Sequence, residues 1–285
     1  MLAYATCVLI WGTTWLAIKF ALLGFPAVFG AGVRFVVASA LLYATGSFVR
    51  GNARREAPPL HLVVVLAFTM FGVNYALTYL AETHLASGLV AVLFGTLPFF
   101  VFGFAHVLVG ERATGRTIGG AALALAGVAL ISLAGAVHGD LAFVIAAIVA
   151  AASSGFANVY LKRFSHASPF ATLPPAMLLA GICLMAYGAL FERIDLHLAL
   201  QPAPLAAVAY LAVFGSAIAF YLNHWLLQRI DSGIMGLSAL MIPVIAVGVG
   251  AAFGGERLGP RDLVGALLVV AGTSIAMTRG ARAVG

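Results

Sequence analysis

Ten runs of apolar residues, each about as long as a helix that crosses a bilayer, dominate this chain of 285 residues. A helix needs about 20 apolar residues to cross the hydrocarbon core. The runs cover residues 2–23, 27–49, 62–81, 86–109, 117–135, 141–161, 170–191, 204–227, 233–254 and 263–278. Charged residues, glycines and prolines separate them, so the loops are short. Because lipid excludes open sheet edges, the sequence predicts an all-α membrane protein with ten transmembrane helices.

The composition excludes the main classes of soluble protein. Apolar residues make up 63% of the chain and charged residues only 8%, whereas about a quarter of a typical soluble domain is charged. A cytosolic enzyme or a nucleic-acid-binding protein is therefore not expected. We interpret the net charge of +6 as arginines in cytoplasmic loops rather than as a surface for nucleic acid. The expected partners are the lipid bilayer and a small-molecule substrate, and the protein is expected to work as a monomer.

The distribution of basic residues predicts the orientation. When the loops are assigned alternately to the two sides of the membrane, ten lysines and arginines fall on the side of the N-terminus and four on the other. Because cytoplasmic loops are enriched in basic residues, both termini are predicted to be cytoplasmic, in a bacterial-type inner (plasma) membrane. The first run has no basic leader region and no convincing cleavage site, so it is interpreted as a retained helix rather than a signal peptide.

The two halves of the chain match each other in order. A shift of 143 residues pairs Gly12 with Gly155, Lys19 with Lys162, and Phe71-Gly72 with Phe214-Gly215. After a slip of two residues, a shift of 145 pairs Pro98 with Pro243, Gly110-Glu111-Arg112 with Gly255-Glu256-Arg257, and Gly120 with Gly265. The predicted units are residues 1–138 and 139–285, with five spans each. Since five is odd, the halves enter the membrane in opposite directions. Transporters with such inverted repeats bind substrate near the midplane, between the repeats.

The ordered set of motifs resembles the EamA family of the drug/metabolite transporter superfamily. The matching pieces are Trp11-Gly12-Thr13-Thr14-Trp15 with Lys19, Arg34-Phe35, Pro98 with Gly110-Glu111-Arg112, and their second-half equivalents. The resemblance covers essentially the whole chain, and within the family it is nearest to the YddG-type aromatic amino-acid exporters. It implies a secondary transporter, commonly an exporter of amino acids, other metabolites or toxic cations. It also implies that the fifth and tenth spans lie outside the cavity.

Polar and aromatic residues inside the spans are the candidate substrate site, because a buried polar group in a membrane needs a partner or a wet cavity. Spans 1, 3, 4, 6, 8 and 9 are expected to line that cavity. The candidate substrate-binding residues are Trp11, Trp15, Asn74, Tyr75, Thr78, Tyr79, Ser154, Asn158, Tyr221 and His224. Pro98 and Pro243 interrupt helix hydrogen bonding at repeat-related positions, so they are candidate gating residues.

Each candidate also has a purely structural interpretation. The tryptophans and tyrosines are also typical of the membrane interface, and the asparagines of bridges between helices. His224 fits a packing residue as well as a substrate or proton site. Arg34 fits either a snorkelling side chain or a substrate carboxylate site, with a structural role favoured because it belongs to the family pattern. Glu111 is expected to fix its loop by capping the next helix or pairing with Arg116, or else to act in gating.

The function predicted from these features is export of a small amphipathic metabolite, with aromatic or large apolar amino acids as the favoured substrates. Efflux of lipophilic cations or drugs is the alternative. No acidic residue lies in the middle of a span, so a proton-coupled antiporter built on one buried carboxylate is not favoured, and coupling is either absent or runs through His224 or Glu82. A membrane enzyme is not expected, because catalytic and metal-binding motifs are missing from the sequence. No cofactor and no metal are predicted.

Overall fold

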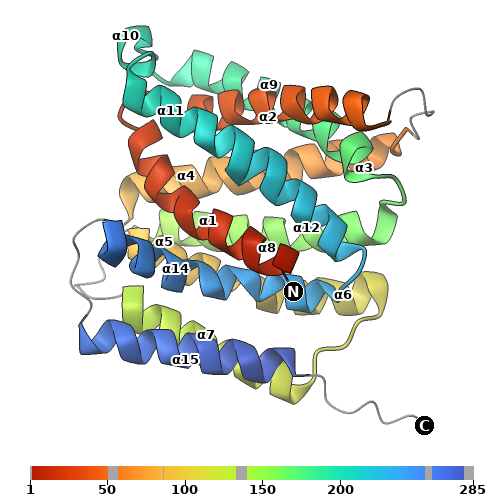
Figure 1. The fold of residues 1–285 in the computed structure, drawn as a ribbon, viewed down its shortest axis with the longest axis vertical. Helices are drawn as coiled ribbons and strands as arrows, with labels where there is room; N and C mark the ends of the chain where they lie inside the picture. Colours follow the sequence, from red (N-terminus) through yellow and green to blue (C-terminus); the bar gives the residue numbers. More distant parts are fainter. Residues whose placement is uncertain (1, 51–56, 86, 133–139, 254–258, 279–285) are drawn as a thin grey trace.

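A computed structural model describes residues 2–50, 57–85, 87–132, 140–253 and 259–278, which are helical apart from short connections (Figure 1). The first half contains α1 (Leu2–Ala21), α2 (Ala27–Arg50), α3 (Leu60–Leu66), the π-helix η1 (Ala67–Val73), α4 (Asn74–His84), α5 (Ser87–Phe94), α6 (Leu97–Val109) and α7 (Gly115–Ser132). The second half contains α8 (Leu141–Phe164), α9 (Pro169–Phe191), α10 (Leu196–Ala199), α11 (Pro202–Tyr210), the π-helix η2 (Leu211–Ile218), α12 (Ala219–Leu227), α13 (Ser232–Gly236), α14 (Ser238–Phe253) and α15 (Pro260–Met277).

The predicted membrane helices are confirmed. Within the described residues, nine helical stretches are long and apolar enough to cross a bilayer. The predicted ninth span is occupied by the shorter helices α13 and α14, which meet at Leu237. The predicted boundary between the halves, at residues 138 and 139, lies outside the described residues, as does the second Gly-Glu-Arg triplet.

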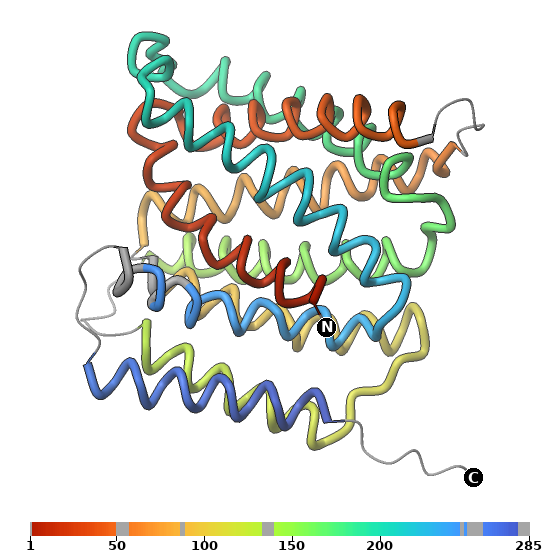
Figure 2. Tube along the Cα trace, in the orientation of Figure 1, coloured from red at the N-terminus to blue at the C-terminus, as the bar shows by residue number. Residues whose placement is uncertain are grey.

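The helices of the two halves pack as inverted repeats. The first helix of one half lies against the fourth helix of the other, so that α1 packs along α14 and α8 packs along α6. Each half also pairs its second helix with the second helix of the other half, α2 with α9, and its fifth with the fifth, α7 with α15. Figure 2 shows the pair α2–α9 at one end of the bundle and α7–α15 at the opposite end. The helices that surround the repeat interface lie between these two pairs, while the short α10 lies at the end occupied by α2 and α9.

Glycines bring α7 and α15 into direct backbone contact. A Cβ atom placed on Gly120 would lie 2.6 Å from Gly272 O, and one on Gly127 would lie 2.6 Å from Gly265 O. These four glycines are related by the repeat. In lipid, helices associate largely through van der Waals packing, which small residues permit at short interaxial distance. The pair therefore forms a close-packed unit at the edge of the bundle.

Besides the ninth span, three spans contain irregular segments that the apolar runs in the sequence do not reveal. η1 and η2 widen the third and eighth spans at equivalent positions, around Phe71-Gly72 and Phe214-Gly215. Such π-helical turns leave carbonyl groups without their usual partner and often occur at functional sites. The fourth span is broken at Gly95 and Thr96, and α6 then begins with Pro98 in its first turn. Proline fits this position because the first turn of a helix leaves its N–H groups unpaired.

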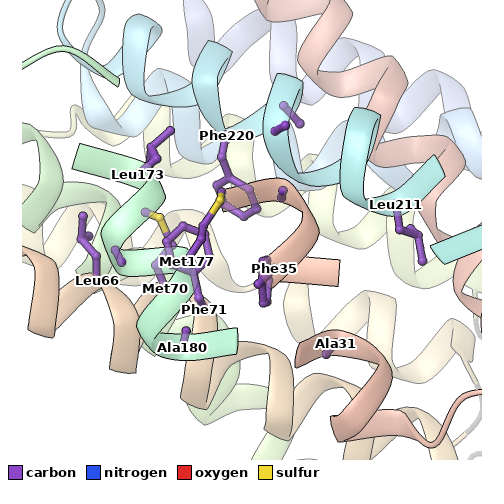
Figure 3. Packing of buried hydrophobic residues seen from close by; sticks show 14 of the residues in the cluster. Ala31, Phe35, Leu66, Met70, Phe71, Leu173, Met177, Ala180, Leu211 and Phe220 are labelled. Carbon is purple, nitrogen blue, oxygen red and sulfur yellow. The ribbon is translucent and has the colours of Figure 1, made fainter. Parts of the chain in front are cut away.

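Aromatic rings fill the largest buried cluster. The ring centroid of Phe71 in η1 lies 5.1 Å from that of Phe35 in α2 and 4.9 Å from that of Phe220 in α12, both with edge contacts. Met70 and Met177 pack among the same helices (Figure 3). Edge-to-face contact between rings adds about 0.5–1.5 kcal/mol beyond the burial of their surface. This cluster joins the two repeats directly beside the polar residue Arg34.

Candidate substrate-binding cavity

A cavity of about 100 Å³ lies between the two repeats. It is lined from all six predicted spans, 1, 3, 4, 6, 8 and 9, and also from the second span through Arg34. No residue of α7 or α15 takes part in the lining, as the resemblance to the EamA family implies. Eight of the ten candidate residues lie around this one cavity, namely Trp11, Trp15, Asn74, Tyr75, Thr78, Tyr79, Ser154 and Asn158.

Tyr221 and His224 are not among the lining residues. The Tyr221 ring packs against Phe170, with 4.8 Å between the centroids. His224 is fully buried, and its Nε2 lies 2.9 Å from Ser165 Oγ, between the end of α12 and the connection that follows α8. Their placement corresponds to packing between helices. Glu82, the other candidate for coupling, is half-buried near the end of α4 and is also absent from the lining.

The amides of the cavity are arranged on both sides of the repeat interface. Asn223 Nδ2 donates to Asn158 Oδ1 at 2.8 Å, and Asn158 Nδ2 donates to the carbonyl of Ser154 at 3.0 Å. In the first repeat, Asn74 Nδ2 donates to the carbonyl of Met70 at 3.1 Å, and Thr78 Oγ1 donates to Asn74 Oδ1 at 3.4 Å. Such bonds fix the orientation of side chains that would otherwise rotate in a small wet space. The cavity therefore presents defined donors and acceptors.

An aromatic wall completes the cavity. Trp11 of α1 makes an edge contact with Phe220 of α12 at 5.8 Å between centroids. Tyr75 lies between them and the second span, with its ring 4.8 Å from Phe35 and 6.3 Å from Phe220. Side chains from both repeats thus form one apolar surface beside the amides. A ligand with one apolar part and one polar part matches this arrangement.

Arg34 is buried rather than snorkelling. Only 1% of its surface is exposed, and its guanidinium lies inside the bundle against η2. Arg34 Nε donates to Ser216 Oγ at 2.6 Å and Nη2 donates to the carbonyl of Gly215 at 3.0 Å. The carbonyl acceptor belongs to the π-helix η2, so the irregular turn supplies part of the site. The snorkelling interpretation of Arg34 is therefore wrong.

Of the lining residues that were not predicted, Arg34 and Asn223 carry the strongest hydrogen-bonding groups, a guanidinium and an amide. Both were detectable in principle, because ionisable and amide groups inside a span generally face a cavity or a partner. For Arg34 the family pattern favoured a structural role, and Asn223 has a leucine, Leu80, at its repeat-equivalent position. Neither position therefore showed the paired pattern that pointed to Trp11 with Ser154, Trp15 with Asn158 and Thr78 with Tyr221.

The two candidate gating prolines occupy different places in their helices. Pro98 stands in the first turn of α6, directly after the break in the fourth span. Pro243 stands inside α14, one residue after Ile242, which lines the cavity. Pro243 removes a backbone hydrogen bond from the interior of α14 and weakens the helix there, whereas Pro98 fits the first turn of α6 and marks the break before it.

Charged groups join the two repeats at the side predicted to be cytoplasmic. Glu111, directly after α6, pairs with Lys162 of α8 and accepts a hydrogen bond from the backbone N–H of Ser232 at 2.8 Å. Lys162 Nζ also donates to the carbonyl of Ile230 at 2.5 Å. The expected pairing of Glu111 with Arg116 is therefore wrong, because both partners of Glu111 belong to the second repeat. Among the described residues, no group of three or more His, Cys, Asp or Glu side chains is arranged to hold a metal ion.

Inverted five-helix repeats around an amphipathic cavity define the class of protein as a membrane transporter. Comparison with known families gives the particular one: the model of the EamA-like transporter family matches residues 1–133 and again 141–278. The chain belongs to this family. A crystal structure of another protein has the same fold, with a TM-score of 0.84 over 97% of this chain and 95% of that chain at 21% identity.

Several curated relatives span nearly the same length. The inner membrane transporter YedA of Escherichia coli K12 is 29% identical over 257 residues, covering 88% of this chain and 81% of its own. A probable terminal-alkyne amino-acid exporter of Streptantibioticus cattleyicolor is 30% identical over 96% of this chain and 91% of its own. A probable amino-acid metabolite efflux pump of Escherichia coli K12 is 25% identical over 94% and 91%.

Proposed function

We propose that this protein exports small amphipathic metabolites, with aromatic or large apolar amino acids as the substrate class, by alternating access through the cavity between its repeats. The observation that supports this most strongly is the combination of an aromatic wall with oriented amides and a guanidinium in one cavity. Two relatives named as an exporter and an efflux pump of amino acids or their metabolites support the substrate class and the direction of transport.

Alternating access requires that the cavity change its size and its opening. Its present volume of about 100 Å³ is below the ~300–1,000 Å³ typical of ligand pockets. A large amino acid therefore enters only when the lining helices move apart. The breaks at η1, η2 and Gly95-Thr96, together with Pro98 and Pro243, are where we expect the helices to bend.

The alternative, efflux of lipophilic cations, is less well supported. Among the residues that the structure describes, the cavity lining contains a guanidinium and no carboxylate. A cationic ligand would meet like charge at Arg34, and repulsion between like charges in a medium of low dielectric is costly. We also propose that the protein works as a monomer in a bacterial-type inner membrane with both termini cytoplasmic, because the basic residues concentrate on that side.

Exchange across proteoliposomes tests the function. Vesicles containing the purified protein are loaded with unlabelled L-phenylalanine, and uptake of labelled L-phenylalanine from outside is followed. We expect transient accumulation above that of protein-free vesicles, and competition by tryptophan and leucine. If no amino acid of the aromatic or large apolar classes exchanges while a lipophilic cation such as tetraphenylphosphonium does, the alternative is correct.

A further inference from the structure

Arg34 is a permanent positive charge inside the bundle. The guanidinium stays protonated in proteins, and here it is almost completely buried at the wall of the cavity. Arg34 lies seven residues into α2, which corresponds to about 10 Å along the helix. That depth places it below the membrane surface, where an ionised group needs compensation.

Neighbouring groups satisfy only part of the guanidinium. Nε and Nη2 donate to Ser216 Oγ and to the Gly215 carbonyl, which fixes the plane of the group against η2. Nη1 is buried and has no hydrogen-bond partner. No carboxylate of a described residue lies within ion-pairing distance of Arg34. The hydroxyl groups of Tyr75 and Tyr79 interact with the guanidinium, and the Tyr75 ring lies 5.0 Å from Cζ. These phenols are uncharged partners, so the positive charge of Arg34 has no anionic partner among the described residues. A buried charge of this kind calls for an anion in the cavity.

A second buried group in the same cavity also has no hydrogen-bond partner, but it is an acceptor rather than a donor. Asn223 is 1% exposed, and its Nδ2 donates to Asn158. Its Oδ1 is buried without a partner. Buried polar atoms in native proteins nearly always have hydrogen-bond partners, and the exceptions call for an explanation. An acceptor beside an aromatic wall suits the ammonium group of a ligand.

We propose that the cavity binds a zwitterionic ligand whose carboxylate pairs with Arg34 through Nη1 and whose ammonium group donates to Asn223 Oδ1. The inference rests on the proposed function and names the head group of its substrates: α-amino acids rather than amines, amides or neutral drugs. The side chain of the ligand then lies against Trp11 and Phe220. Specificity follows because a ligand without a carboxylate leaves a buried donor unpaired.

Matched ligands test the carboxylate site without altering the protein. Binding to the purified full-length protein in lipid nanodiscs is measured calorimetrically for L-phenylalanine, L-phenylalaninamide and 3-phenylpropanoate. L-Leucine, L-tryptophan and their amides form a second set. We expect each acid to bind at least about tenfold more tightly than its amide, the effect of losing one hydrogen bond to a charged group. We expect 3-phenylpropanoate, which lacks the ammonium group, to bind more weakly than L-phenylalanine but still measurably.

Two variants then assign each preference to a residue. Arg34→Gln is expected to remove the preference for acid over amide, and Asn223→Ala to remove the preference for L-phenylalanine over 3-phenylpropanoate. Thermal unfolding shows whether each variant is folded. Should Arg34→Gln fail to fold, the ligand comparison on the unaltered protein still decides the question.

The outcomes separate this inference from the proposed function. Equal affinity for acids and amides, or no binding by any carboxylate in folded protein, overturns the Arg34 assignment. Exchange of amino acids in proteoliposomes together with equal affinity for the amides leaves the transport proposal standing without this site. Selective binding of acids without any exchange supports the site and contradicts transport.

Discussion

Lys162 Nζ lies 2.6 Å from Glu111 Oε1, and this ion pair joins the end of one repeat's fourth helix to the first helix of the other repeat. Each side chain is 21% exposed, so the pair is only partly screened by water. Both partners also bond to the segment around Ile230 and Ser232, where α13 begins. These contacts therefore hold the two repeats together at the side predicted to be cytoplasmic. The duplicated sequence has Lys19, in the last turn of α1, at the position equivalent to Lys162.

Removing the ion pair should destabilise the described state. We expect Glu111→Gln and Lys162→Met each to cost about 1–2 kcal/mol, and the double variant to cost less than their sum, because groups in contact are not independent. Thermal or denaturant unfolding in a mild detergent measures the difference. Arg116→Gln is the matched control, since Arg116 is exposed on the neighbouring turn. Additive costs in the double variant would contradict a direct interaction.

The membrane-spanning helices were predictable because the thickness of the bilayer sets the minimum length of an apolar helix that crosses it. Continuous apolar runs near 20 residues fix helices within narrow limits, and an odd number of spans in each duplicated half fixes their opposite directions. The breaks were not predictable in the same way. The π-helices η1 and η2 contain ordinary apolar sequence, AFTMFGV and LAVFGSAI, and their geometry depends on neighbouring helices.

The site was predictable in part, for a physical reason. Residues such as Trp15 and Asn158 pair across the duplication, so their shared position indicated a shared cavity. The pairing of Glu111 with Lys162 was not visible, because a carboxylate beside two arginines offers nearer partners in sequence. Whether the Arg34 side chain points to the membrane surface or into the bundle depends on which helix supplies its hydrogen-bond acceptors. Only the folded position of Ser216 and Gly215 decides that it points inward.

Substitution of the cavity aromatics and amides should impair transport selectively. Trp15→Ala and Asn158→Ala are each expected to lower exchange of L-phenylalanine by about tenfold, which corresponds to about 1.4 kcal/mol. Trp225→Ala is the control, because Trp225 packs on Arg229, with 4.0 Å from its ring centroid to Cζ, and does not line the cavity. Normal exchange by both cavity variants, in folded protein, would remove them from the site.

Glycine substitutions should separate close packing from helix propensity. Gly120→Val places side-chain atoms against the backbone of α15, so we expect a loss of about 1–3 kcal/mol from overpacking. Gly119→Val, on the next residue of α7, meets no atom within 4 Å and serves as the control. Unfolding temperatures of the two variants in the same detergent measure the effect. Equal temperatures would show that α7 and α15 do not pack as described.

A methyl group at Gly215 should disturb the carboxylate site indirectly. The added Cβ atom would lie 3.0 Å from Arg34 Nη2 and 2.8 Å from Thr14 Cγ2, so the guanidinium must shift. We expect Gly215→Ala to weaken binding of L-phenylalanine several-fold while its affinity for L-phenylalaninamide changes little. Gly103→Ala, whose Cβ meets nothing within 4 Å, is the control. An equal loss for both ligands would indicate a general change in the cavity instead.

The proposed function requires that the cavity between the inverted repeats open in turn to each side of the membrane. Ser154→Cys places a thiol in the cavity wall, in a background where Cys7 and Cys183 are replaced by alanine. A membrane-impermeant thiol reagent is then applied to oriented vesicles from one side or the other. We predict modification from both sides, slowed by L-phenylalanine in each case. Modification from one side only, with or without the amino acid, would contradict alternating access.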